Sequence, residues 1–224
     1  KDDGNSTYAA TVTVNNVAPS VAAGPDVTNY SGQVHQLIAT YSDPGVLDTH
    51  TATINWGDGS AVQDLGTVQG GTINASHQYF VPGDYNIEVC VTDDDGGKGC
   101  DTAVKTVRRL VVQIDIKPGS FPNSINLGNK GNVPVGVFTG TYEGVSFDAT
   151  TIDRTTLLFA GAPDLGIGKS PQDLDADGDL DMVFHFETLK LNLTSASTEA
   201  TLTGQTSSGV YFVGSDSVRI VPPK

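Results

Sequence analysis

Nine residues, Asp173–Asp181, constrain this chain more than any other stretch, because they gather five aspartates into one short segment. Carboxylates held this close repel one another, so a compact structure that contains them favours a bound cation. The spacing D-x-D-x-D-G-x-x-D suits calcium, which takes about six to eight oxygen ligands in a tight loop. The sequence therefore predicts a Ca²⁺ site with these ligands: Asp173, Asp175, Asp177, Asp179 through its backbone carbonyl, and Asp181.

The residues after this loop predict a strand. Met182, Phe184 and Phe186 recur with the two-residue period of a half-buried strand. Phe184 also stands where the loop of an EF-hand carries a bidentate Glu, so the segment departs from that motif. It resembles instead the calcium loops of integrin-type and thrombospondin-type repeats, which hold structure. The alternative is a solvated acidic turn without a metal.

Length and charge limit the class of protein. The 224 residues predict two domains of about 100 residues each. The net charge of -14 argues against nucleic acid or an anionic membrane as a partner, because both need clustered Lys and Arg. No apolar run is long enough to predict membrane insertion. Only four of the 26 acidic residues are Glu, and because Asp favours turns, this imbalance predicts a loop-rich, all-β chain.

The two cysteines, Cys90 and Cys100, flank the segment VTDDDGGKG, which is typical of a hairpin turn between two strands. The simplest interpretation is a cross-strand disulfide, which requires an oxidising compartment and so a secreted or cell-surface protein. Two buried free thiols are the alternative.

Residues 17–108 predict a sandwich of short strands separated by turn signals such as Asp43-Pro-Gly. The expected strands are Val34–Tyr41, Thr51–Trp56, Gly71–Tyr79, Asp84–Val91 and Ala103–Val107. Residues 1–16 are similar to residues 94–107 at an offset of about ninety positions, which is typical of tandem modules. We therefore expect 1–16 to be the last strand of a preceding repeat, or an edge strand of this domain.

Four motifs in this region resemble a PKD (polycystic kidney disease) domain. They are W-G-D-G-S at 56–60, H-x-Y at 77–79, P-G-x-Y-x-I-x-V at 82–89 and D-D-D-G at 93–96. The resemblance implies an Ig-like sandwich within a large extracellular protein, with Trp56 in the core and His77 packed rather than chemically active. Some PKD domains bind calcium, which makes Asp43 and Asp48 a weaker second metal site, with ordinary turn residues as the alternative.

Residues 109–224, which begin at the Arg108-Arg109 boundary, again predict strands and turns, and hence a second, jelly-roll-like sandwich joined closely to the first. This half resembles a module at the C-terminal end of secreted bacterial proteins. The resemblance rests on I-D-I-K-P-G-S-F-P-N-S-I-N at 114–126, residues 131–138, F-D-A-T-T-I-D at 147–153, the aspartate loop, and S-D-S-V at 215–218. The resemblance implies a secreted protein and a sandwich architecture, but it implies no settled activity.

No grouping of catalytic residues is evident, because the four histidines are dispersed and the sequence has neither a G-x-S-x-G nor a phosphate-binding motif. We expect a non-enzymatic region of a larger protein that binds an extracellular ligand or mediates adhesion, with polysaccharide as the expected partner. The candidate ligand-binding residues are Phe121, Asn123, Tyr142, Phe147 and His185. The alternative for the aromatics is ordinary packing, and the alternative function is a stiff spacer.

Overall fold

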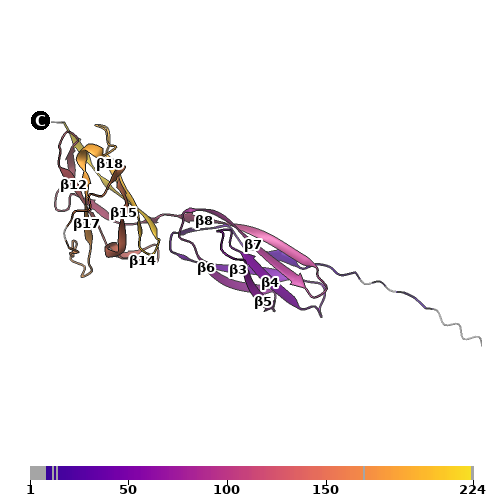
Figure 1. The fold of residues 1–224 in the computed structure, drawn as a ribbon. Helices are drawn as coiled ribbons and strands as arrows, with labels where there is room; N and C mark the ends of the chain where they lie inside the picture. Colours follow the sequence, from indigo (N-terminus) through magenta and orange to yellow (C-terminus); the bar gives the residue numbers. More distant parts are fainter. Residues whose placement is uncertain (1–8, 12, 14, 169, 223–224) are drawn as a thin grey trace, which may run out of the picture. The chain divides into compact units, whose positions relative to one another are not determined.

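The computed structural model describes residues 9–222, except 12, 14 and 169. Within this part of the chain the regular structure is all-β, as predicted, and its helical elements are two short 3-10 turns, η1 Ala149–Thr151 and η2 Thr188–Lys190. The strands of each sheet either all precede or all follow Arg109 in the sequence, so we describe an N-terminal and a C-terminal sandwich separately (Figure 1). Among the described residues, no helix has the length and apolar character needed to cross a membrane.

The N-terminal sandwich contains a three-stranded and a five-stranded sheet. The first has the order β1 (Ser20–Ala22), β3 (Val34–Ser42), β6 (Thr72–Gln78). The second has the order β2 (Val27–Tyr30), β8 (Lys98–Arg108), β7 (Gly83–Asp93), β4 (His50–Asn55), β5 (Gln63–Val68). β2 runs parallel to β8, whereas β4 pairs antiparallel with both β5 and β7. The five predicted strands are present, and the short strands β1, β2 and β5 were not predicted.

Alternation along the strands builds the N-terminal core. In β3, His35, Leu37 and Ala39 are buried, while the residues between them are exposed. Trp56 is buried and donates its indole N–H to Gln63 Oε1 at 2.9 Å, which confirms its predicted place in the core. A disulfide joins Cys90 to Cys100 and ties β7 to β8, so the predicted pairing is also confirmed.

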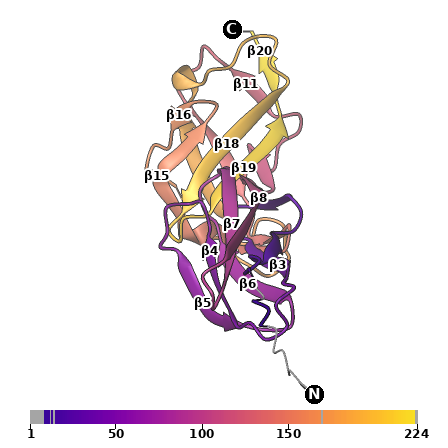
Figure 2. The ribbon, with the colours of Figure 1, turned by 90° about the vertical axis from the view of Figure 1, so that its right-hand side faces the viewer.

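The C-terminal sandwich is built on a five-stranded sheet with the order β16 (Ala162–Pro163), β15 (Ile152–Phe159), β18 (Glu199–Thr206), β19 (Tyr211–Ser217), β9 (Leu110–Val111). A three-stranded sheet has the order β10 (Ile114–Ile116), β12 (Asn132–Val137), β17 (Met182–Glu187). Two small sheets complete it, β11 (Ser124–Asn126) with β20 (Arg219–Val221), and the hairpin β13 (Gly140–Tyr142) with β14 (Val145–Phe147). Figure 2 shows β18 and β19 side by side, as their antiparallel register requires.

Aromatic side chains fill the C-terminal core. Five phenylalanines are at most 2% exposed: Phe147, Phe159, Phe184, Phe186 and Phe212. The rings of Phe159 and Phe186 lie 5.3 Å apart, and those of Phe147 and Phe212 lie 5.1 Å apart. Burying each such side chain contributes about 1.5–3 kcal/mol, so this sandwich has a large apolar core of its own.

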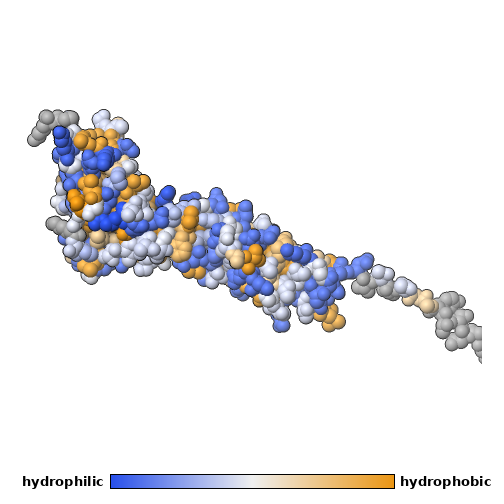
Figure 3. All heavy atoms as spheres, in the orientation of Figure 1, coloured by the Kyte–Doolittle hydropathy of each residue, from blue (hydrophilic) through white to orange (hydrophobic). Residues whose placement is uncertain are grey.

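Two further features concern the ends and the surface. The prediction of a strand within residues 1–16 falls largely on residues 1–8, 12 and 14, which lie outside the described residues, and the described positions up to Pro19 belong to no strand. On the face drawn in Figure 3, hydrophobic residues form separate patches among hydrophilic ones. Proximity divides the described residues into two compact units: the first contains those up to 25 with 37–75 and 86–103, and the second contains 26–36, 76–85 and those from 104 onward.

Candidate functional site

The aspartate loop lies between β16 and β17 and is closed by its own backbone. Gln172 and Asp181 exchange backbone hydrogen bonds of 3.1 and 2.9 Å. The Asp181 side chain is fully buried, and its two oxygens accept the backbone N–H groups of Thr139 at 2.9 Å and Leu174 at 2.8 Å. Asp181 therefore anchors the loop to its surroundings, a role that the sequence spacing alone did not distinguish from that of a ligand.

Three carboxylates converge within this loop. One oxygen each from Asp173, Asp175 and Asp177 lie within 4.8 Å of one another. Asp173 accepts the backbone N–H groups of Ala176 at 2.7 Å and Gly178 at 3.1 Å, which folds the chain around its carboxylate. Ala176 and Gly178 adopt φ values of 66° and 101°, the left-handed conformations that such a tight loop requires. The alternate spacing thus places three short acidic side chains in one cluster.

Asp179 supplies the fifth carboxylate of this loop. Its Oδ1 is buried and has no hydrogen-bond partner among the described residues. Loss of water and the negative charges of Asp177, Asp181 and Asp175 raise the pKa of Asp179. Loss of water and the negative charges of Asp177 and Asp181 raise the pKa of Asp175. The cluster consists only of hard oxygen donors on one loop, which is the ligand chemistry that Ca²⁺ takes.

A second acidic cluster lies in the N-terminal sandwich. Oxygens of Asp43, Asp48 and Asp93 lie within 4.8 Å of one another. Sequence reasoning offered the first two residues and missed Asp93, which the pairing of Asp93 with His50 between β7 and β4 brings into place. The sequence signal for Asp93 was the two-residue period of β7, which places its side chain on the same face of the strand as that of buried Val91.

Hydrogen bonds within the protein already engage this second cluster. Asp43 accepts the Gly45 N–H at 2.7 Å through Oδ1, and its Oδ2 lies 3.1 Å from His50 Nε2. Asp93 accepts the Asn16 side-chain amide at 2.9 Å and the Gly97 N–H at 2.7 Å. The cluster therefore has a structural role in holding the turns between strands, independently of any metal.

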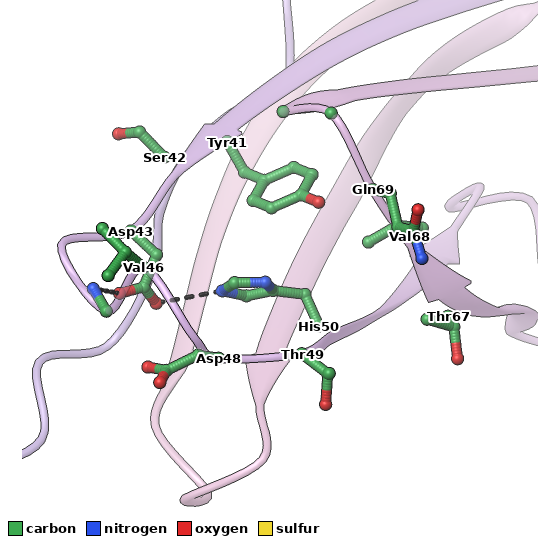
Figure 4. A pocket seen from close by; sticks show the side chains of 13 residues that line it. Tyr41, Ser42, Asp43, Val46, Asp48, Thr49, His50, Thr67, Val68 and Gln69 are labelled. Carbon is green, nitrogen blue, oxygen red and sulfur yellow. Dashed lines mark hydrogen bonds and ion pairs between the residues drawn. The ribbon is translucent and has the colours of Figure 1, made fainter.

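A surface cavity of about 420 Å³ adjoins the second cluster (Figure 4). It is lined by Tyr41, Ser42, Asp43, Gly45, Val46, Asp48, Thr49, His50, Thr67, Val68, Gln69, Gly70 and Gly71. The rings of Tyr41 and His50 form one wall, with centroids 5.1 Å apart and planes inclined by 52°. Loss of water and the charges of Asp43, Asp94, Asp95 and Asp93 raise the pKa of Asp48.

Two of the predicted ligand-binding residues are buried. Phe147 is 2% exposed and belongs to the C-terminal core, and Asn123 is 3% exposed. Asn123 donates its amide to Asp216 Oδ2 at 2.8 Å and to the Ser217 carbonyl at 3.0 Å. These side chains cannot face a surface ligand, and we withdraw both from the ligand-binding set. The bonds of Asn123 join the first and last motifs of the C-terminal module, which gives those motifs a structural role.

The other three predicted residues differ in exposure. Phe121 is 89% exposed. Tyr142 is half-buried, packs edge-on against Phe147 at 6.0 Å, and donates its hydroxyl to the Phe138 carbonyl at 3.0 Å. His185 lies 2.9 Å from Asn132 Oδ1 through Nδ1 and lines a cavity of about 250 Å³ with Gln172. Phe121 is the predicted aromatic with the most surface to offer a ligand.

Comparisons with known proteins address the N-terminal half most directly. The PKD domain family model matches residues 16–108. No curated protein matches the chain.

Solved structures show weaker likenesses. The PKD domain of an M14-like peptidase from a Thermoplasmatales archaeon is 22% identical over 41% of this chain and 94% of its own, with a TM-score of 0.36. The Bacteroides ovatus mixed-linkage glucan utilization locus protein SGBP-B, in complex with a mixed-linkage heptasaccharide, is 16% identical over 92% of this chain and 48% of its own, with a TM-score of 0.30. Fibronectin(III)-like modules of Clostridium thermocellum CbhA are 12% identical over 90% of this chain and 93% of their own, with a TM-score of 0.30.

These structural likenesses are too low to assign a function, so the family model is the comparison that informs this chain. It covers the residues that carry the motifs W-G-D-G-S, H-x-Y and D-D-D-G. The family match supports a PKD domain over residues 16–108.

Proposed function

We propose that this chain is a non-catalytic, calcium-stabilised accessory region of a larger secreted or cell-surface protein, and that it binds polysaccharide. The observation that carries the proposal is the aspartate loop, in which carboxylate oxygens of Asp173, Asp175 and Asp177 lie within 4.8 Å of one another. The buried, unpartnered Oδ1 of Asp179 supports it, because an acceptor without a donor favours a cation as its partner.

Calcium would act on stability. A divalent cation neutralises the repulsion among these aspartates in the folded chain, whereas no fixed geometry holds their oxygens together in the unfolded chain. At a thousandfold excess over its dissociation constant, calcium would add about 4 kcal/mol to the free energy of unfolding. The site in the second cluster, Asp43 and Asp48 with Asp93, is the weaker candidate for a second calcium because protein donors already bond Asp43 and Asp93.

The extracellular assignment is supported by the Cys90–Cys100 disulfide, which persists in oxidising compartments, and by the PKD family match. The polysaccharide assignment is supported by the open cavity beside Tyr41 and His50 and by the exposed ring of Phe121. A passive spacer is the second candidate. It is favoured by the similarity of residues 1–16 to residues 94–107, which is typical of tandem modules.

The metal proposal is tested by calorimetric unfolding of the full chain in calcium and in chelator. Trp56 is the single Trp and lies in the N-terminal sandwich, so its fluorescence separates that transition from the C-terminal one. We expect calcium to raise the transition that Trp56 does not report, and Asp175→Asn to abolish this rise. Glu199→Gln removes one exposed acidic charge from the same sandwich and serves as the matched control. A C-terminal midpoint that is the same in calcium and in chelator contradicts the proposal.

The ligand proposal is tested by affinity electrophoresis of the full chain through gels that contain soluble polysaccharides. Retardation in at least one polymer is expected if the chain binds glycans. Unchanged mobility in every polymer, together with an intact Trp56 signal, favours the spacer.

A further inference from the structure

We propose that the cavity beside Tyr41 and His50 is the glycan-binding site, and that it takes an uncharged sugar residue in preference to an acidic one. This inference rests on the proposed function, because it names the place and the ligand class of polysaccharide binding. The sequence offered aromatics of the C-terminal sandwich for this role, whereas the cavity lies between two turns of the PKD domain.

The cavity has a suitable size and position. Its volume of about 420 Å³ lies within the range typical of small-molecule sites. Several of its lining residues are exposed, including Ser42, Thr49, Thr67 and Gln69, so it opens to solvent as a site for one segment of a long polymer must.

One wall supplies an apolar face. The ring of Tyr41 is held by its neighbour His50, whose position is set by pairing with Val68 on one side and Asp93 on the other. His50 is in turn tied to Asp43 at 3.1 Å. Sugar rings carry C–H faces that pack against aromatic side chains, and a ring wall already fixed by packing loses little entropy on binding.

The opposite rim supplies hydrogen-bonding groups that match sugar hydroxyls. Figure 4 shows Thr67 and Gln69 on the far side of the cavity from Asp43. A hydroxyl and an amide can each both donate and accept, which suits neutral hydroxyls. The turn between β5 and β6 is Gln69, Gly70 and Gly71, and the two glycines, with φ values of 76° and 72°, add no side chain to this rim.

The charges around the cavity decide the ligand class. Asp43 and Asp48 line it, and the charges of Asp93, Asp94 and Asp95 reach Asp48. None of the lining residues is Lys or Arg. When no calcium occupies this weaker candidate site, an acidic sugar meets like charges without a cationic partner, and this repulsion disfavours uronic or sulfated polymers. An uncharged sugar avoids this cost.

The test is affinity electrophoresis of the full chain with hydroxyethyl cellulose, β-glucan, galactomannan and arabinoxylan as uncharged probes, and carboxymethyl cellulose and alginate as acidic probes. Hydroxyethyl and carboxymethyl cellulose share a backbone, so this pair isolates the effect of charge. We expect retardation by at least one uncharged polymer and weaker or no retardation by the acidic ones.

Variants locate the site. Gln69→Ala removes a rim hydrogen bond and is expected to weaken binding about two- to tenfold. Tyr41→Leu keeps bulk, removes the ring face, and is expected to weaken it at least as much, with Trp56 fluorescence as the check on folding. Gln36→Ala, at an exposed glutamine outside the cavity, should bind like the parent, and Phe121→Ala tests the alternative site at that exposed ring.

Each outcome decides between the two proposals. Binding that survives Gln69→Ala and Tyr41→Leu, or that falls with Phe121→Ala alone, overturns the cavity assignment and leaves glycan binding in place. Preference for carboxymethyl over hydroxyethyl cellulose overturns the ligand class. Retardation by none of the polymers contradicts the proposed function itself and the cavity with it.

Discussion

The two sandwiches differ in the titratable groups that they bury. In the N-terminal sandwich, the basic groups Lys105 and His35 are 1% and 6% exposed. The described C-terminal core is an apolar cluster, and five aspartates of this sandwich lie in one loop, where Asp181 is fully buried but accepts two backbone N–H groups. Loss of water acts on the buried basic groups, whereas loss of water and mutual repulsion both act on Asp175 and Asp179, so we expect the two halves to respond to different solution conditions.

Lys105 is the clearest case of this difference. Its Nζ is buried without a hydrogen-bond partner among the described residues. Loss of water lowers its pKa to about 8. Loss of water on burial is the main cause that lowers the pKa of His35 to about 4, and the charges of Lys105 and His77 contribute to the same shift. The N-terminal core thus carries an electrostatic cost from buried basic groups.

The largest expected effect is loss of the Cys90–Cys100 disulfide. Closing this loop restricts the unfolded chain, so reduction or a Cys90→Ala/Cys100→Ala double variant should cost the N-terminal sandwich about 2–3 kcal/mol. Denaturant unfolding followed by Trp56 fluorescence measures the change, with the C-terminal transition as the internal control. Equal destabilisation of both transitions would contradict the assignment of this effect to the N-terminal sandwich alone.

Lys105→Met should raise the stability of the N-terminal sandwich by about 1–3 kcal/mol, because it removes an unsatisfied buried polar group and keeps the volume. The folded pKa lies below the ordinary value of 10.5, so the parent should gain stability as the pH rises from about 8 to 10.5. The variant should lack that gain. Lys98→Met, at an exposed position on the same strand, is the matched control, and an equal rise in both variants would contradict the explanation.

At neutral pH the smallest effect is that of His35, because it develops only in acid. The unfolded chain takes up a proton below pH 6.5, whereas folded His35 does so only near pH 4. Stability should therefore fall as the pH drops from 6.5 to 4, by at most about 1.4 kcal/mol per pH unit. Trp56 fluorescence during thermal unfolding at several pH values measures this slope, which His35→Gln should reduce. A slope that persists in the variant would assign it to other groups.

Sequence reasoning found the strands whose side chains alternate clearly. β3, β4, β7 and β17 occur within one or two residues of their predicted bounds. The missed strands are mostly short, such as β9, β13 and β16, and depend on pairing with distant partners more than on their own pattern. The same limit explains Phe147 and Asn123, because a sequence pattern does not tell an exposed aromatic or amide from one that the rest of the sandwich covers.

The aspartate spacing and the cysteine positions were sufficient by themselves to predict an acidic loop that leads into a strand, and a cross-strand disulfide. Both depend on residues close together in the chain, where local geometry decides the outcome. The roles of Asp181 as an anchor, of Lys105 as a buried amine, and of the cavity wall were decided only by the tertiary structure. Tyr41, His50 and Gln69 come from separate strands and turns, and strand pairing alone brings them to one place.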